Sequence, residues 1–198
     1  MVEFLEKEHI YLIDGVITPS VTQILEKLFP DKYKGIPEDI LQRKASYGSV
    51  MHKYIEQYEK GVITINLNYI QEASFNQYIK LKDKYNIEVL EQEQIVHYRR
   101  IYAGTFDMIA KVGKKKYLID IKTTASLDKE YLSWQLSLYE KAYGKQFDGL
   151  ACIWLPKKDL GQFVEIERKS KNEIKKLLEA YKNERYWKNT KVFNWKVR

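Results

Sequence analysis

Three stretches with strand character follow one another in the middle of the chain, and they constrain the fold more than any other feature. They span Ile87–Tyr98, Ile101–Val112 and Lys116–Lys122, and all are rich in β-branched and aromatic residues. Only two or three residues separate each stretch from the next, which is enough for a hairpin turn but not for a crossover. The segment therefore predicts an antiparallel meander.

Segments with helical periodicity lie on both sides of this meander. Their apolar residues recur three or four positions apart, which is typical of a helix with one buried face. Helices are predicted over residues 46–59, 68–85, 132–143 and 171–187, and two further strands over residues 149–156 and 163–167. This order of elements favours an α/β fold in which a central mixed β-sheet is flanked by helices.

The beginning of the chain favours a small hairpin and short helices. Asp14-Gly15 is a strong tight-turn dipeptide, and a short apolar run lies on either side of it. Ser20 offers an N-cap for the helix that follows. A short helix is predicted around Ile40, separate from the helix that begins at Ser46.

The chain of 198 residues contains no internal repeat, low-complexity tract or Gly/Ser/Pro-rich linker, so a single domain is expected. Its predicted parts are an N-terminal hairpin with helices (1–45), a central core (46–168) and a basic C-terminal helix with a tail (169–198). A hydrophobic content of 44% is too high for a disordered chain. The single cysteine, Cys152, excludes an internal disulfide framework and cysteine-ligated zinc or iron–sulfur sites.

Neither a membrane span nor a signal peptide is predicted. The longest uninterrupted apolar run, Leu150–Leu155, is far too short to cross a bilayer. Glu3, Glu6 and Glu8 interrupt the N-terminus where a signal peptide would need an apolar core. We therefore expect a soluble intracellular protein with no membrane partner.

Positive charge is concentrated at the C-terminal end. The net charge is +7, and the segment from Lys169 onwards holds ten Lys or Arg against three Glu, so the remainder is neutral overall. Aromatic residues are interleaved with these charges: Tyr181, Tyr186, Trp187, Phe193 and Trp195. Charge combined with stacking is suited to nucleic acid, although a solvated amphipathic helix followed by a packed tail accounts for the same pattern.

Two aspartates are predicted to face each other in the meander. If Gly113-Lys114 forms a two-residue turn, residues whose numbers sum to 227 are cross-strand partners, and Asp107 lies opposite Asp120. Their Cβ atoms would then be about 4.5–5.5 Å apart. Lys122 shares the face of Asp120 because side chains alternate along a strand. A three-residue turn would shift the register, and the two acids would never meet.

Directly opposed carboxylates destabilise a sheet, and Lys122 offsets only part of that repulsion. Such a pair is tolerated mainly when a hard cation bridges it or when one carboxylate is protonated. Oxygen ligands at this spacing suit Mg²⁺ or Mn²⁺. A solvent-exposed hairpin with shifted register is the alternative interpretation.

An Asp followed by Asp-X-Lys at the end of an apolar strand resembles the active-site signature of the PD-(D/E)XK nuclease superfamily. Asp107 matches the first acidic residue of that signature, and Asp120 and Lys122 match its paired acid and lysine. Phe106 stands where the name-giving proline would be, a common departure within the superfamily. The tripeptide alone also occurs by chance in many proteins, so the flanking residues decide how specific the match is.

Upstream residues are similar to the RecB-like branch, which includes phage and mitochondrial-type exonucleases. Gly48 and His52 resemble its Gly-x-x-x-His helix and lie one turn apart, which leaves room above His52 for a metal or phosphate. His52 alone is more often a structural histidine on a helix flank. Glu93 resembles an acid that the branch carries on the preceding strand, and Glu91, two residues away on the same strand face, is its rival.

Downstream, Gln135 and Tyr139 resemble the Gln-x-x-x-Tyr motif of the same branch. Positions i and i+4 share a helix face, so both side chains can point towards Lys122 or a DNA backbone. In isolation such a pair is more often part of a half-buried helix stripe, here with Leu132 and Tyr143. The resemblance extends from about Tyr11 to Tyr143.

The resemblance implies a restriction-endonuclease-like fold in a single nuclease domain, with Asp107, Asp120 and Lys122 as catalytic residues. It also implies two Mg²⁺ or Mn²⁺ ions, held by His52, Glu93, Asp107, Asp120 and the Ile121 carbonyl. Gly48, Gln135 and Tyr139 would support the site or contact DNA. No helicase motor is expected alongside this module, because these 198 residues lack a Gly-x-x-x-x-Gly-Lys loop.

The function expected on this basis is that of a DNA exonuclease acting on single strands or duplex ends. Its role would be phage or bacterial recombination and repair, in the cytoplasm, with DNA and a recombination or replication protein as partners. A structure-selective or nicking endonuclease is the nearest alternative, and an inactive nucleic-acid-binding module is an alternative of another class. Polarity, processivity, DNA against RNA preference and oligomeric state are left open.

Overall fold

The structure is a computed structural model that describes residues 2–5 and 10–189, with side chains described as far as Lys182. The chain divides into two compact units, and the boundary between them falls between Arg168 and Lys169. This is also where the sequence places the start of the basic C-terminal helix. That the whole chain forms one nuclease domain stays a prediction.

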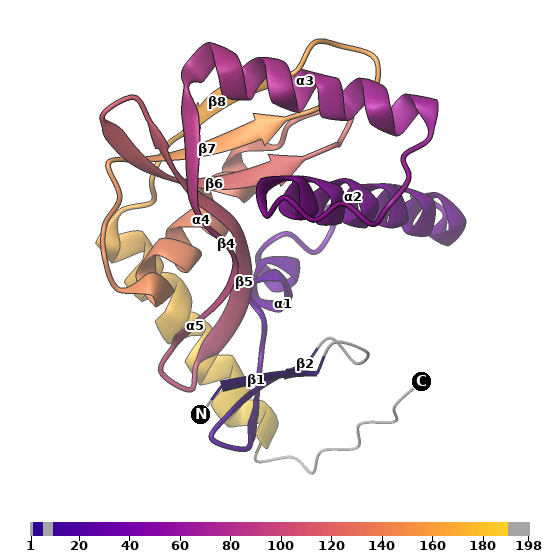
Figure 1. The fold of residues 1–198 in the computed structure, drawn as a ribbon. Helices are drawn as coiled ribbons and strands as arrows, with labels where there is room; N and C mark the ends of the chain where they lie inside the picture. The colour runs from indigo at the N-terminus through magenta and orange to yellow at the C-terminus, as the bar shows by residue number, and fades with distance from the viewer. Residues whose placement is uncertain (1, 6–9, 190–198) are drawn as a thin grey trace. The chain divides into compact units, whose positions relative to one another are not determined.

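A five-stranded sheet with strand order β4-β5-β6-β7-β8 forms the centre of the first unit (Figure 1). The strands span Ile87–Tyr98 (β4), Tyr102–Val112 (β5), Lys115–Lys122 (β6), Gly149–Trp154 (β7) and Gln162–Ile166 (β8). Neighbouring strands are antiparallel except β6 and β7, which are parallel because a helix connects them. The predicted mixed α/β architecture is confirmed.

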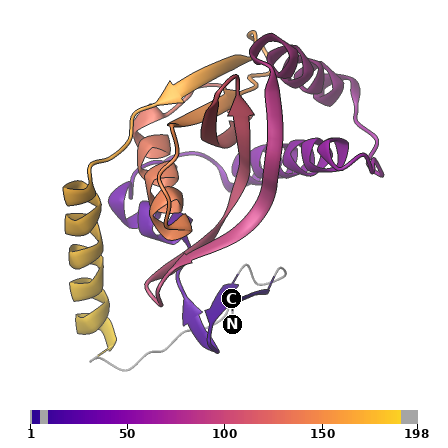
Figure 2. The ribbon, with the colours of Figure 1, turned by 60° about the vertical axis from the view of Figure 1, so that its left-hand side comes forward.

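Helices cover both faces of this sheet (Figures 1 and 2). Helices α2 (Glu38–Glu59) and α3 (Tyr69–Tyr85) lie on one face, and α4 (Lys129–Tyr143) lies on the other. The core beneath α2 and α3 is built from one face of the strands and from buried helix residues, namely Ile55, Tyr78, Leu81, Ile87, Met108, Ala110, Tyr117, Ile119, Ile121, Ala151, Ile153 and Leu155. Tyr117, Ile119 and Ile121, which are alternate residues of β6, therefore point into this core.

Helix α2 corrects one prediction. The sequence suggested a short helix around Ile40 and a second helix from Ser46, but a single helix runs from Glu38 to Glu59. No proline interrupts this stretch, and an ion pair between Arg43 and Asp39 at 2.7 Å supports its exposed first turns.

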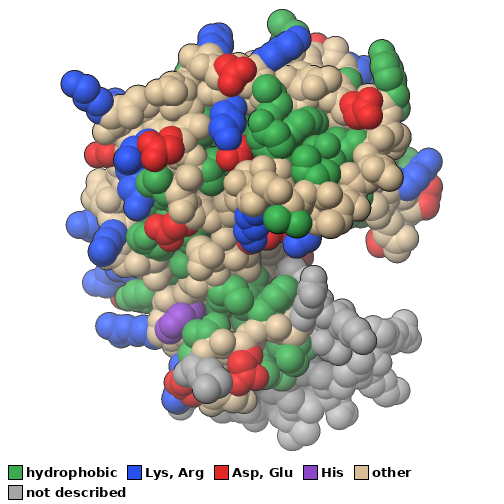
Figure 3. Space-filling model, in the orientation of Figure 1, with side chains coloured by type: hydrophobic (Ala, Val, Ile, Leu, Met, Phe, Trp, Pro, Cys, Tyr) green, Lys and Arg blue, Asp and Glu red, His purple; other side chains and the backbone are tan. Residues whose placement is uncertain are grey.

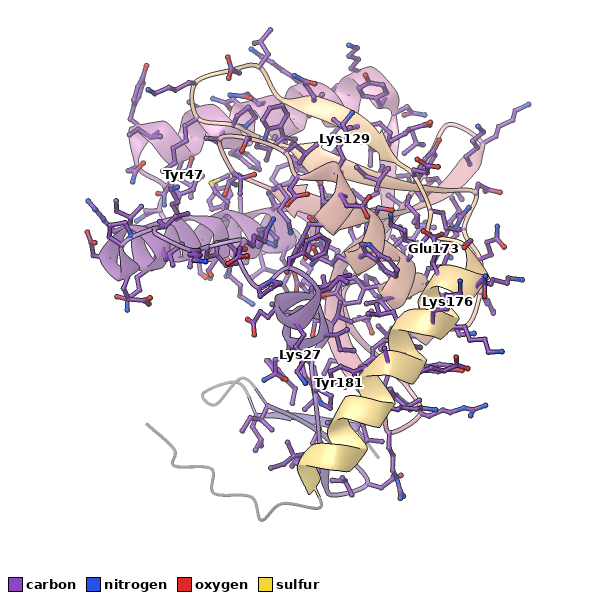
Figure 4. All side chains as sticks on the ribbon, turned by 180° about the vertical axis from the view of Figure 1, so that it is seen from behind. Lys27, Tyr47, Lys129, Glu173, Lys176 and Tyr181 are labelled. Atoms are coloured by element: carbon purple, nitrogen blue, oxygen red, sulfur yellow. The ribbon has the colours of Figure 1, made fainter. Side chains whose placement is uncertain are left out.

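Helix α2 is also tied to α3 through Tyr47. Figure 4 shows Tyr47 between the two helices. Its hydroxyl lies 2.8 Å from Ser74 Oγ and donates to the Ile70 carbonyl at 3.3 Å. Exposed hydrophobic residues lie in the segment that joins these helices and at the start of α3, namely Val62, Ile63, Tyr69 and Ile70. Figure 3 shows hydrophobic side chains gathered on the face that carries both helices.

Side-chain caps fix the beginnings of α3 and α4. Asn68 and Gln71 form a capping box at the start of α3. Asp128 caps α4 by accepting a hydrogen bond from the Tyr131 backbone N–H at 3.0 Å. Because α4 follows β6 directly, this cap sets where the residues of α4 lie relative to the end of β6.

A three-stranded antiparallel sheet, β1-β2-β3, precedes the main sheet. Its strands are Val2–Leu5 (β1), Ile10–Ile13 (β2) and Val16–Thr18 (β3). The hairpin of β2 and β3 was predicted, whereas β1 was missed because Glu3 interrupts its short apolar run. Helix α1 (Val21–Leu28) follows, with the predicted Ser20 cap in a capping box.

The second unit contains helix α5 (Lys171–Asn189). Ser170 and Glu173 bond reciprocally at its start, where the Glu173 N–H donates to Ser170 Oγ at 3.2 Å. The side chains of Tyr186, Trp187, Phe193 and Trp195, which the sequence linked to nucleic acid, lie outside the described residues. Within the described part of the chain, none of the helices combines the length and apolar character needed to span a membrane.

Candidate active site

The register of β5 and β6 is the one predicted from a two-residue turn. Ile109 pairs with Leu118 and Met108 with Ile119, so partner numbers sum to 227. Gly113 opens the turn with a φ of 62°, a left-handed conformation that glycine adopts without strain. The alternative three-residue turn is therefore wrong.

The hydrogen-bonded ladder ends at Met108 and Ile119, one step before Asp107 and Asp120, so the direct opposition of these two residues stays a prediction. Asp107 Oδ2 accepts a hydrogen bond of 2.6 Å from the Ile121 backbone N–H. Beyond this point β5 still pairs with β4, and β6 still pairs with β7, but β5 and β6 no longer pair with each other. The carboxylate thus replaces a backbone carbonyl as acceptor at the point where the sheet opens.

His52, Glu93 and Asp107 meet at this opening. They come from α2, β4 and β5, and one potential ligand atom of each lies within 4.8 Å of the other two. His52 Nδ1 lies 3.4 Å from Asp107 Oδ1, and its Nε2 lies 2.9 Å from the Ile121 carbonyl oxygen. An imidazole nitrogen, two carboxylates and a nearby carbonyl form a donor set suited to a divalent cation.

Glu93 and Glu91 point in different directions, so the prediction that they share a strand face is wrong. The Glu91 carboxylate accepts a hydrogen bond from the Tyr143 hydroxyl at 3.0 Å and lies 3.7 Å from Lys116 Nζ. Glu93 has a φ of 48°, and the register of β4 shifts between Val89 and Glu91. The register shift lies before both glutamates, so it is the left-handed backbone at Glu93 that interrupts the alternation between them. A left-handed non-glycine residue costs about 1–3 kcal/mol.

Asp120 and Lys122 form a second pair beside this group. Asp120 is 2% exposed, and Lys122 Nζ donates to its Oδ1 at 2.9 Å. The same ammonium lies 2.7 Å from Oδ2, but outside hydrogen-bond geometry, so Oδ2 is buried without a hydrogen-bond partner. Asp120 is not part of the 4.8 Å group of His52, Glu93 and Asp107.

The pKa values at the site show how closely the charges are packed. Burial raises the pKa of Asp120 to about 6 and that of Glu93 to about 7. Burial acts against the charged form of Asp107 as well, but His52 and Lys122 lower its pKa below the ordinary value. Burial acts to lower the pKa of His52, whereas Asp107 raises it to about 9. Carboxylates this crowded are short of positive charge, which a divalent cation would supply.

Helix α4 supports the site from inside the protein. Tyr139 is buried, and burial raises the pKa of its phenol well above the ordinary value, while the nearby Gln135 side chain acts to lower it. A Cβ added at Gly104 would lie 2.6 Å from Tyr139 Cε1, so the ring is seated against bare backbone. Gln135 Oε1 is buried and has no hydrogen-bond partner. The predicted pair therefore shares one helix face, but Tyr139 is too deeply buried to contact a DNA backbone.

Gly48 lies beside the segment that follows Lys122. A Cβ added there would lie 3.6 Å from Thr123 Oγ1, which is ordinary van der Waals contact. The described neighbours of Gly48 would therefore accept an alanine at this position. Gly48 borders the segment that follows β6.

Trp154 was not among the predicted residues. It pairs with Lys122 across β6 and β7, and its indole N–H donates to the Thr124 carbonyl at 2.7 Å. The sequence did contain a signal, because a strand–helix–strand crossover brings the carboxyl ends of both strands to the same edge of a sheet. The last residue of the apolar strand should thus have been placed next to Lys122.

None of the known protein-family models matches the chain, and no curated protein matches it. Among solved structures, it is similar to an alkaline exonuclease from Laribacter hongkongensis, with 13% identity, a TM-score of 0.48 and coverage of 87% of this chain and 92% of that one. The complex of that enzyme with dAMP gives 17% identity, a TM-score of 0.47 and coverage of 87% and 92%.

A phage-related exonuclease from Haemophilus somnus gives 10% identity, a TM-score of 0.40 and coverage of 83% of this chain and 89% of that one. All three TM-scores lie below 0.5. The function therefore has to be argued from the residues of this chain.

Proposed function

We propose that the chain is a metal-dependent deoxyribonuclease that hydrolyses phosphodiester bonds. The observation that carries the proposal is the group of His52, Glu93 and Asp107 lying beside the Asp120–Lys122 pair where β5 and β6 separate. Buried acids with raised pKa values, a histidine and a lysine at one opening of a sheet are a combination that favours metal-assisted chemistry.

The residues expected to hold Mg²⁺ or Mn²⁺ are His52, Glu93, Asp107, Asp120 and the Ile121 carbonyl. The chain fits such ions, because the donors are oxygen and imidazole nitrogen, and because Asp120 Oδ2 is buried without a hydrogen bond. When bound, two such ions would supply Lewis acidity for the phosphate and would lower the pKa of a coordinated water. Their number is part of the proposal.

Lys122 supplies a fixed positive charge. Its ammonium is held by the buried Asp120 carboxylate, which fixes its position. The negative charges of Asp120 and Asp107 outweigh burial and raise the pKa of Lys122, so it stays protonated in the free protein. In this state it orients the attacking water and neutralises charge that develops on the phosphate. Asp120 thus has two proposed roles. Its carboxylate holds the Lys122 ammonium in place, and it is one of the carboxylates that would bind metal.

Within this activity we favour an exonuclease acting on single strands or duplex ends, in phage or bacterial recombination and repair, within the cytoplasm. The basis is the motif resemblance of Gly48, His52, Gln135 and Tyr139 to the RecB-like branch. A structure-selective or nicking endonuclease has the same catalytic residues. A non-catalytic nucleic-acid-binding module is disfavoured, because the residues needed for catalysis converge.

The test is cleavage of end-labelled single strands, blunt duplexes and circular single strands, with Mg²⁺, Mn²⁺ or EDTA. We expect metal-dependent release of mononucleotides or short products from linear DNA and none from circles. Cleavage of circles would assign an endonuclease, and tight DNA binding without any metal-dependent product would refute the proposal. Asp120→Asn should abolish cleavage without changing the circular dichroism spectrum, and full activity in this variant would also refute it.

A further inference from the structure

A hollow lies between the segment after α1 and the first turn of α4. Its volume is about 110 Å³, and aromatic rings and lysines line it, among them Phe29, Lys32, Tyr33, Lys34 and Tyr131. In Figure 4, Lys27 marks α1 and Lys129 marks the start of α4, the two helices that border it. A hollow of this size has room for one small ring system and not for a folded partner.

The aromatic walls differ in how much of each ring is available. Tyr131 is only 8% exposed and packs against Phe29, with ring centroids 5.5 Å apart. Tyr33 is 51% exposed. Phe29 and Tyr131 therefore serve the contact between α1 and α4, whereas the ring of Tyr33 offers a face to a ligand.

The lysines bring positive charge to the same place. Lys32 Nζ lies 4.1 Å from the centre of the Tyr131 ring and forms an ion pair with Asp128. Only 19% of the Lys32 side chain is exposed, so these contacts fix its ammonium inside the hollow. Lys34 is exposed and lies 3.0 Å from Asp31. One lysine is thus fixed within the hollow, and the other lies at its rim.

This hollow is close to the candidate active site. Tyr131 lies in the first turn of α4, one turn before Gln135, so both residues share a helix face. The charges of Lys122 and Asp120 act on the Tyr131 phenol, alongside burial, which raises its pKa to about 12. Helix α4 therefore borders the hollow through Tyr131 and the candidate active site through Gln135.

We propose that this hollow binds one unpaired nucleotide next to the scissile phosphate, an inference that rests on the proposed nuclease function. The base stacks on Tyr33, and Lys34 and Lys32 contact its phosphate and sugar edge. Glu26 also lines the hollow, and its carboxylate repels phosphate, so the base enters and the phosphate stays at the rim. Aromatic stacking with flanking lysines is the usual way to hold single-stranded nucleic acid.

The proposal assigns a substrate preference. A base can stack on Tyr33 only when it has left its partner strand, so the hollow favours single strands and frayed ends over closed duplex. Stacking is tolerant of sequence, because every base presents a π-face. The hollow should therefore distinguish single-stranded from double-stranded DNA but not one base from another.

The experiment uses short oligodeoxythymidylates that carry one 2-aminopurine, placed in turn at each of the terminal positions, in EDTA so that no cleavage occurs. Stacking on Tyr33 should quench the fluorescence at one position. The quench should persist in Tyr33→Phe and be lost in Tyr33→Ala. Tyr69→Ala is the matched control, because Tyr69 is 85% exposed at the start of α3 and does not line the hollow.

A kinetic measurement with Mg²⁺ or Mn²⁺ completes the test. Tyr33→Ala should raise KM for single strands roughly 5- to 150-fold, the equivalent of about 1–3 kcal/mol per stacked base, with a much smaller change for blunt duplex. An unchanged quench in Tyr33→Ala, or equal losses in Tyr33→Phe and Tyr33→Ala, would overturn the subsite. Wild-type protein that quenches but never cleaves would overturn the nuclease function and leave the binding site standing, so the two failures are distinguishable.

Discussion

The Asp107 carboxylate accepts a hydrogen bond of 2.6 Å from the backbone N–H of Ile121, at the position where β5 and β6 stop pairing. The Ile121 carbonyl in turn lies 2.9 Å from His52 Nε2. Ile121 of β6 thus contacts both Asp107 of β5 and His52 of α2. A candidate metal ligand therefore also holds the backbone of the strand that carries Asp120 and Lys122.

This dual position predicts that two substitutions of Asp107 separate charge from backbone support. Asp107→Asn keeps an oxygen that can accept from Ile121, so it should abolish metal-dependent cleavage with little loss of stability. Asp107→Ala leaves the buried Ile121 N–H unpaired and should cost about 1–3 kcal/mol more. Urea unfolding of both variants, together with a cleavage assay, measures the two effects, and equal stability of Asn and Ala variants would contradict the structural role.

Glu93 and Glu91 provide a matched pair of substitutions. Glu93→Gln removes a charge from the group with His52 and Asp107, so metal affinity and cleavage should fall at least tenfold. Glu91→Gln removes the same charge two residues away, where the carboxylate contacts Tyr143 and Lys116, and should leave metal affinity within about twofold of wild type. Titration calorimetry with Mn²⁺ checks both variants. Equal losses would mean that the orientation of the two acids is wrong.

Much of the fold could be predicted because its signals are local. Alternation in the meander and a turn at Gly113 were enough to predict the register of β5 with β6 as far as Met108 and Ile119. Helix periodicity likewise located α3 and α4 to within a few residues. These features depend on neighbours close in the sequence, so the sequence shows them directly.

The site was harder to predict because its geometry depends on departures from regular strands. Extrapolating the ladder placed Asp107 opposite Asp120, but the ladder ends one pair earlier, and the Ile121 N–H bonds to the Asp107 side chain instead. Simple alternation put Glu91 and Glu93 on one face, and the left-handed backbone at Glu93 reverses this. Such long-range pairing and local strain leave no periodic signal in one sequence.

Gly104 is predicted to be intolerant of any side chain. Its missing Cβ would lie 2.6 Å from Tyr139 Cε1 and 3.3 Å from Val21 Cγ2, so Gly104→Ala should force repacking that costs about 1–3 kcal/mol. Gly48→Ala is the control, because its nearest contact is 3.6 Å and an interior helix alanine gains about 0.5–1 kcal/mol over glycine. Thermal unfolding should move in opposite directions for the two variants, and a destabilised Gly48→Ala would show that the control site is tighter than the structure indicates.

The cap of α4 should give a pH-dependent contribution to stability. Burial acts to raise the pKa of Asp128, but hydrogen bonds from Lys32 and the Tyr131 N–H lower it below its ordinary value. Because the folded-state pKa is depressed, this stabilisation is present above the unfolded value, about 3.9, and is lost as the pH falls through the folded value. Asp128→Asn keeps a capping oxygen but removes the charge. Its free energy of unfolding should therefore be lower than that of the wild type at neutral pH, and the difference should vanish in acid.

Asp128→Ala separates the cap from the charge. It removes the oxygen that accepts from Tyr131 as well, and a lost N-cap costs about 1 kcal/mol at any pH. Urea unfolding at several pH values measures the three proteins. If Asp128→Asn were less stable than the wild type by the same amount down to acid pH, loss of the Asp128 charge would not be the reason for its lower stability.

Lys122 should affect turnover much more than DNA affinity. It is one of 34 basic residues, so its removal takes little from nonspecific attraction to phosphate, whereas its ammonium is fixed beside Asp120 where charge develops. Lys122→Ala should lower kcat about 10²- to 10³-fold and leave the Kd for an oligonucleotide, measured in EDTA, nearly unchanged. Lys114→Ala removes an exposed charge in the β5–β6 turn and should change neither quantity. If Lys122→Ala weakened binding as much as turnover, Lys122 would be a DNA contact and the catalytic assignment would be lost.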